Sequence, residues 1–142
     1  MKTQLIRNFV VAILAVASAY AQGSPRLTVQ VPFGFHVGAS MLSAGEYTVD
    51  TDVAPSVVRL RSADSKSAVM ILANSVETST TTSQGKLIFN QYGDEYFLSQ
   101  VWISGNRTGR ELRKSRQERA LERELAARAV KPETIAVAGK TR

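Results

Sequence analysis

The sequence of 142 residues contains no cysteine and only one histidine, His36. Without cysteine the chain has no disulfide, no thiolate nucleophile and no cysteine-based zinc site. The single histidine has no visible ligand partner or nucleophile in the sequence. We therefore interpret His36 as a surface residue on the polar face of a strand, rather than as part of a site.

Motifs that carry chemistry are also missing. The sequence has no glycine-rich phosphate loop and no G-x-S-x-G nucleophile elbow. Asp50 and Asp52 look faintly like the start of a calcium loop, but the required downstream spacing of glycine and glutamate is absent. We therefore predict no cofactor, no metal and no catalytic residue. A hydrolase that uses two of the scattered carboxylates is a remote alternative, because the fold sets their separation.

The one long hydrophobic run lies at the N-terminus. Lys2 and Arg7 precede an apolar segment at residues 9–21. This segment ends in the small-x-small pattern Ala-Tyr-Ala. This pattern predicts a secretory signal peptide over residues 1–21, with cleavage before Gln22 and export to the periplasm or the exterior. A membrane anchor is the weaker interpretation, because a spanning helix needs about 20 apolar residues. We expect no transmembrane span in the mature chain and no nucleic-acid partner.

Charge is divided unevenly along the chain, whose overall net charge is +6. Residues 22–106 carry a net charge of −2, whereas residues 107–142 carry a net charge of +6. The sequence therefore predicts a slightly acidic body followed by a basic C-terminal part.

Alternating apolar and polar residues predict the first strands. Residues 27–37 alternate throughout, which is typical of a strand with one buried face. Pro32 cannot donate a ladder hydrogen bond, so this strand lies at an edge or is interrupted there. Residues 38–45 are rich in turn formers, and residues 46–52 resume the alternation.

Four more strands are predicted further along the chain, at residues 56–61, 68–76, 86–92 and 95–103. The apolar run that starts at residue 68 indicates a strand covered on both faces. Gly93-Asp94 is typical of a two-residue hairpin turn. This turn would place Phe89 opposite Leu98, on one core face whose predicted members are Leu87, Phe89, Tyr96, Leu98 and Trp102.

A chain of this length accommodates one domain. About six strands with short connections predict an all-β domain, an antiparallel sandwich or a small barrel, followed by one C-terminal basic helix. We expect a signal peptide at 1–21, a β-domain at 22–109, a charged helix at 110–130 and a mobile tail at 131–142.

The helix itself is predicted over residues 116–129, and it ends before Pro132. Ser115 and Glu118 have the spacing of a capping box. Glu124 and Arg128 have the spacing of a favourable ion pair on a helix. The apolar stripe is thin, so the helix docks lightly on the sheet, pairs with a partner helix or lies free.

The basic residues of this region are the candidate partner-binding residues. A solvated helix face is the plain interpretation, and contact with an acidic envelope component (a protein, an anionic lipid or a polysaccharide) is the functional one. Each basic residue near an anionic membrane adds about 1 kcal/mol. The apolar stripe lacks aromatics and is poorly suited to insertion. The candidates are Arg110, Arg113, Lys114, Arg116, Arg119, Arg123 and Arg128.

Several motifs occur in order along the chain. They are VPFGFHVG at 31–38, LSAGEYTV at 42–49, LIFNQYGDEYFLSQVW at 87–102 and a G-x-E-L-x-x-S-x-x-E run at 109–118. Together they resemble the motifs of a family of small exported bacterial proteins of unknown function. Ser43 stands where the family pattern has proline. The resemblance implies export and an all-β body, and it implies no activity.

These observations favour a non-enzymatic interaction or structural module of the cell envelope, with a basic helix that contacts an acidic partner. The alternative is a small-ligand or glycan-binding module that uses the β-domain.

Overall fold

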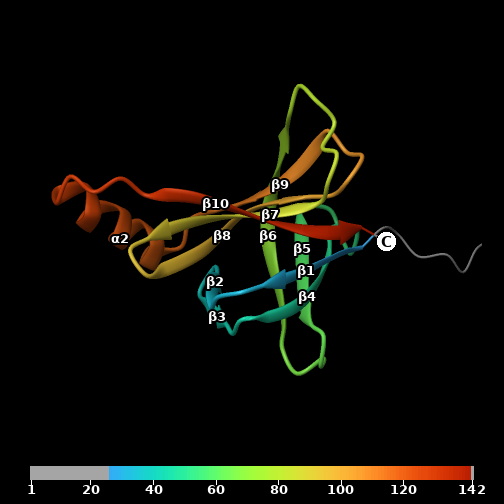
Figure 1. The fold of residues 1–142 in the computed structure, drawn as a ribbon, viewed down its shortest axis with the longest axis horizontal. Helices are drawn as coiled ribbons and strands as arrows, with labels where there is room; N and C mark the ends of the chain where they lie inside the picture. Colours follow the sequence, from blue (N-terminus) through green and yellow to red (C-terminus); the bar gives the residue numbers. More distant parts are fainter. Residues whose placement is uncertain (1–25, 142) are drawn as a thin grey trace, which may run out of the picture.

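The computed structural model describes residues 26–141, so the predicted signal peptide lies outside the described residues. This part of the chain folds into ten strands and one helix (Figure 1). The one helix in this part of the chain is not long and apolar enough to cross a membrane. The elements are β1 (Leu27–Val31), β2 (Phe35–Val37), β3 (Ser40–Leu42), β4 (Gly45–Asp50), β5 (Val57–Ser62), β6 (Ala68–Glu77), β7 (Lys86–Tyr92), β8 (Glu95–Trp102), β9 (Thr108–Leu112), α2 (Arg116–Ala127) and β10 (Glu133–Thr141).

Eight strands form a closed antiparallel barrel in the order β8-β7-β10-β1-β4-β5-β6-β9, which closes because β9 pairs with both β6 and β8. The fold is therefore all-β with one C-terminal helix, as predicted, and it is a barrel rather than a sandwich. The predicted number of about six strands was too low. Closure leaves these eight strands without an unpaired edge.

The break at Pro32 separates two strands that the alternation had joined. β1 lies in the barrel between β4 and β10, whereas β2 leaves the barrel wall and pairs in parallel with β8. β3 pairs with β2 and extends the sheet outside the closed ring. The predicted interruption at Pro32 is confirmed.

The C-terminal region is the largest departure from the predicted domain boundaries. Residues 131–142 contain β10, which pairs with β7 over six residue pairs and with β1 over three, so the prediction of a mobile tail was wrong. Residues 108–112 form β9 rather than a linker and the start of a helix. The barrel therefore includes chain from both sides of α2, and a domain ending at residue 109 would be incomplete.

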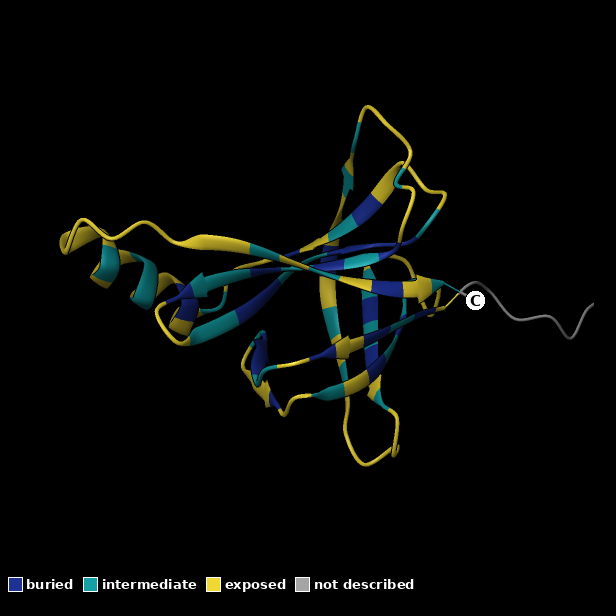
Figure 2. Ribbon diagram, in the orientation of Figure 1, coloured by how far each residue is buried: buried dark blue, intermediate teal, exposed yellow. Residues whose placement is uncertain are grey.

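Apolar side chains from all sides fill the barrel. Figure 2 marks the buried residues in dark blue along the strands. Each fully buried aliphatic or aromatic side chain contributes about 1.5–3 kcal/mol. The innermost ones include Leu27, Val29, Val49, Val58, Leu60, Leu87, Phe89 and Val101.

The β7–β8 hairpin turns at Gly93-Asp94, and Phe89 lies opposite Leu98, as predicted. A β-bulge interrupts the ladder beyond this pair, because Ile88 pairs with Gln100. The extra residue reverses the alternation in the rest of β8. Trp102 therefore lies on the outer face of the barrel wall rather than on the predicted core face, since its neighbour Val101 faces the core.

Strand β6 is exposed along much of its length, which contradicts the expectation of a strand covered on both faces. Met70 and Leu72 are 64% and 70% exposed on its outer side. A continuous apolar run indicates burial only when a second layer covers the sheet, and no described element covers β6 from outside.

Candidate functional site

Helix α2 begins where the sequence predicts. The hydroxyl oxygen of Ser115 accepts a hydrogen bond of 3.1 Å from the backbone N–H of Glu118, which is the Ser half of the capping box. The predicted ion pair between Glu124 and Arg128 is also present, at 3.3 Å.

The Glu118 side chain anchors the helix to the barrel. Its Oε2 accepts hydrogen bonds from the Tyr92 hydroxyl at 2.9 Å and from Asn90 Nδ2 at 3.1 Å, both on β7. Glu118 is the buried residue of α2, at 4% exposure, whereas Leu121 and Leu125 are half-exposed. Of the three arrangements left open, light docking on the sheet is therefore the one observed.

Burial raises the pKa of the Tyr92 hydroxyl, and the hydrogen bond to Glu118 and the charges of Glu118 and Glu122 raise it further. The phenol is therefore held neutral as a hydrogen-bond donor to the carboxylate.

Four of the seven candidate basic residues are engaged within the protein. One of them is Arg123, whose Nε donates to the backbone oxygen of Arg119 at 3.3 Å within the helix. Arg110 lies in β9, not in the helix, and its Nη1 donates to Ser75 Oγ at 2.7 Å. Lys114 forms an ion pair with Glu122 at 2.8 Å, and Arg128 pairs with Glu124 as described above. The prediction that the charged helix starts at residue 110 was therefore wrong.

Arg116, Arg119 and Arg123 form what we call the basic ridge. Their spacing of three and four residues places them on one face of α2, opposite the Glu118 anchor. All three are exposed, and within residues 26–141 none of the ion pairs includes them. Arg113 is exposed just before the helix. Figure 1 shows α2 standing at one end of the barrel, beyond the β7–β8 turn.

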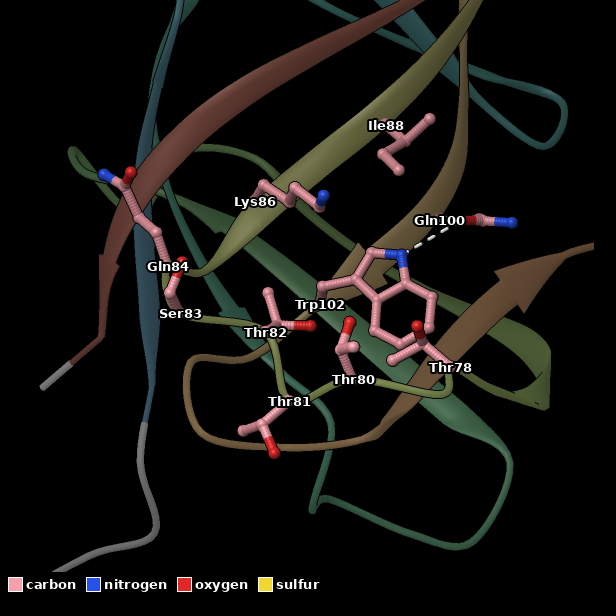
Figure 3. A pocket seen from close by; sticks show the side chains of 10 residues that line it. All are labelled: Thr78, Thr80, Thr81, Thr82, Ser83, Gln84, Lys86, Ile88, Gln100 and Trp102. Carbon is pink, nitrogen blue, oxygen red and sulfur yellow. Dashed lines mark hydrogen bonds between the residues drawn. The ribbon is translucent and has the colours of Figure 1, made fainter.

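A second region was not identified from the sequence. A groove of about 480 Å³ lies outside the barrel wall, between the β6–β7 loop and the outer face of β7 and β8 (Figure 3). Its loop side consists of residues 78 and 80–84, and its floor consists of Lys86, Ile88, Gln100 and Trp102. We call it the threonine groove, after Thr78, Thr80, Thr81 and Thr82.

Backbone hydrogen bonds fix the loop that forms this groove. The N–H of Thr78 donates to Arg107 O at 2.9 Å, and the N–H of Gly105 donates to Thr82 O at 2.8 Å. The Arg107 guanidinium donates to Ser79 O at 2.8 Å. The β6–β7 loop is therefore tied to the β8–β9 turn over most of its length.

Hydrogen bonds between side chains fix the floor of the groove. Trp102 Nε1 donates to Gln100 Oε1 at 2.9 Å, and Gln100 Nε2 donates to Glu111 Oε2 at 3.0 Å. On β9, Gly109 leaves room for the indole, because a Cβ at this position would lie 2.7 Å from its ring atoms. Trp102 is the only tryptophan of the chain and is 6% exposed.

His36 is buried, which overturns its interpretation as a surface residue. It is 7% exposed, its ring stacks on Phe97 with the centroids 4.4 Å apart, and its Nε2 shares a hydrogen bond with Glu95 Oε2. Because β2 pairs with β8 instead of continuing β1, both of its faces are covered. The contacts of His36 join β2 to β8.

Within the described range, no three His, Asp or Glu side chains come together as a group that could hold a metal ion. Comparisons of the chain with known protein families, with curated proteins and with solved structures found no match. The basic ridge and the threonine groove are the two candidate sites of the described residues.

Proposed function

We propose that the protein is an exported, non-enzymatic interaction module of the cell envelope, and that its basic ridge contacts an acidic envelope component. The observation that carries this proposal is the Glu118 anchor, which fixes α2 on β7 and leaves the three ridge arginines directed away from the barrel. The signal-peptide pattern of residues 1–21 supports export.

The chemistry of the ridge fits carboxylate or phosphate groups. Arginine presents a planar fork of donors that binds either anion in a bidentate manner. Ala120 and Ala127 flank the arginines on the same face, and neither provides the bulky apolar surface that membrane insertion needs. The contact is therefore electrostatic, and it weakens as salt screens the charges.

Co-sedimentation of the mature chain, residues 22–142, with isolated cell envelopes tests this function. The test variant is Arg116→Gln/Arg119→Gln/Arg123→Gln. The matched control is Arg61→Gln/Lys66→Gln/Lys140→Gln, which removes the same charge from exposed positions elsewhere. At about 1 kcal/mol per basic residue, the ridge variant should bind roughly 100-fold more weakly at low salt, and the control should bind nearly as the parent does.

Equal binding of the two triple variants would overturn the proposal, because net charge alone would then explain the contact. Anionic and neutral lipid vesicles, together with protease-treated envelopes, identify the source of the acidic groups. Mass spectrometry of the exported protein tests the location separately, with a chain starting at Gln22 as the expected result.

A second candidate function is a small-ligand or glycan-binding module. The observation that favours it is the threonine groove, whose walls are fixed before any ligand arrives.

A further inference from the structure

The threonine groove has the dimensions of a ligand site. Its volume of about 480 Å³ falls within the roughly 300–1,000 Å³ that is usual for small-molecule pockets. One side comes from the loop and the other from two paired strands, so the groove has a fixed floor and a fixed wall. A site that is ordered in advance spends little binding energy on organising itself.

Hydroxyl groups dominate the wall of the groove. Figure 3 shows the hydroxyls of Thr80 and Thr82 directed toward the indole of Trp102. A hydroxyl both donates and accepts hydrogen bonds, so a row of them matches a ligand that itself carries several hydroxyls. Ile88 and the exposed part of Trp102 supply the apolar surface against which the C–H groups of such a ligand lie.

The charge of the groove adds a further requirement. Among the residues that the structure describes, Lys86 is the only charged one that lines the groove, and neither Asp nor Glu does. In Figure 3 the Lys86 ammonium points over the floor beside the indole. Within residues 26–141, Lys86 takes part in none of the ion pairs. A ligand that forms an ion pair with the Lys86 ammonium must therefore carry a negatively charged group.

We propose that the threonine groove binds an acidic sugar, in which the hydroxyls meet the threonines and a carboxylate or phosphate meets Lys86. This site is separate from the basic ridge, because Lys86 begins β7 whereas the Glu118 anchor contacts the other end of that strand. The proposal does not depend on the function proposed for the ridge.

The single tryptophan makes the test direct, because the indole N–H of Trp102 gives one resonance that reports on the groove floor. The mature chain is titrated with glucose, glucuronic acid and glucose 6-phosphate, followed by two-dimensional NMR. The three sugars differ only at C6, so they separate the need for a negative group from the need for a sugar. They also separate carboxylate from phosphate.

We expect saturable shifts of the Trp102 resonance with at least one acidic sugar and about tenfold weaker binding of glucose. Lys86→Gln should reduce the affinity for the acidic sugar to that for glucose, whereas Lys140→Gln, on the outer side of β10, should not change it. Thr82→Val should lower the affinity for the acidic sugar and the affinity for glucose by similar factors.

The absence of a saturable shift with all three sugars would overturn the proposal. Equal binding of glucose and the acidic sugars, or unchanged affinity in Lys86→Gln, would overturn the assignment of the ligand class. The ridge variant Arg116→Gln/Arg119→Gln/Arg123→Gln should bind the sugar as the parent does, so failure here and failure of the envelope contact are distinguishable.

Discussion

Replacement of Glu118 by alanine is the sharpest test of how α2 is held. The substitution removes the acceptor of two hydrogen bonds, from the Tyr92 hydroxyl and from Asn90 Nδ2. Tyr92 is 3% exposed, so its hydroxyl would lose its partner in a site that water reaches poorly. The change therefore combines a lost charge-assisted contact with a buried donor left unpaired.

The magnitude follows from these two contacts. A hydrogen bond to a charged group contributes about 1.5–3 kcal/mol, and two that share one acceptor oxygen do not add fully. The better helix propensity of alanine offsets a few tenths of a kcal/mol. We expect Glu118→Ala to lower the free energy of helix opening by about 2–4 kcal/mol. Glu118→Gln, which keeps one acceptor oxygen, should cost about half as much.

Amide hydrogen exchange across α2 measures this opening directly, and urea unfolding measures the effect on the barrel. Glu122→Ala is the matched control on the same helix, because its exposed ion pair with Lys114 contributes at most about 1 kcal/mol. If Glu118→Ala changes both measurements by no more than Glu122→Ala does, the anchor does not hold the helix and the ridge is not fixed on the barrel.

Other positions test the rest of the structure. The folded state raises the pKa of Tyr92, so unfolded chains lose this proton first and stability should fall as the pH rises above about 10; Tyr92→Phe should flatten that fall in urea unfolding followed across pH. Gly139→Ala should destabilise the barrel by about 1–3 kcal/mol or more, because the new Cβ would lie 2.7 Å from the carbonyl oxygen of Thr28 on β1. Deletion of residues 131–142 removes β10, and circular dichroism should show loss of the folded barrel rather than removal of a tail. Leu72→Ser should change stability by less than about 0.5 kcal/mol, because this side chain is 70% exposed.

Local patterns predicted the parts of the fold that local physics determines. The Gly93-Asp94 turn fixes the first pairs of the β7–β8 hairpin, and Ser115 fixes the start of α2. Neither requires knowledge of a distant partner. The same holds for the break at Pro32, which follows from its missing N–H.

Features set by distant pairing were mispredicted or missed. The bulge in β8 moves Trp102 to the outer face, and the residues near the bulge give no sequence signal that predicts it. Residues 133–141 alternate only weakly, with Ile135 and Val137 as their larger apolar residues, so only the pairing with β1 and β7 reveals a strand. The alternation of residues 27–37 places His36 on the polar face of a single strand, whereas β2 is separate from β1 and pairs with β8.

The placement of β10 also explains where the two candidate sites lie. In the barrel, β9 and β10 flank the β7–β8 hairpin, so the chain between them must pass the end of that hairpin, and α2 makes this crossing. The Glu118 anchor lies at this end, near Tyr92, while Lys86 and the groove lie at the start of β7. A rise of about 3.3 Å per residue puts the two regions roughly 20 Å apart. Substitutions at such a distance should act additively. In a variant that combines the ridge substitutions with Lys86→Gln, envelope binding should therefore fall by the factor measured for the ridge substitutions alone. Sugar binding should fall by the factor measured for Lys86→Gln alone. Coupling between the two effects would mean that the groove and the ridge serve one ligand.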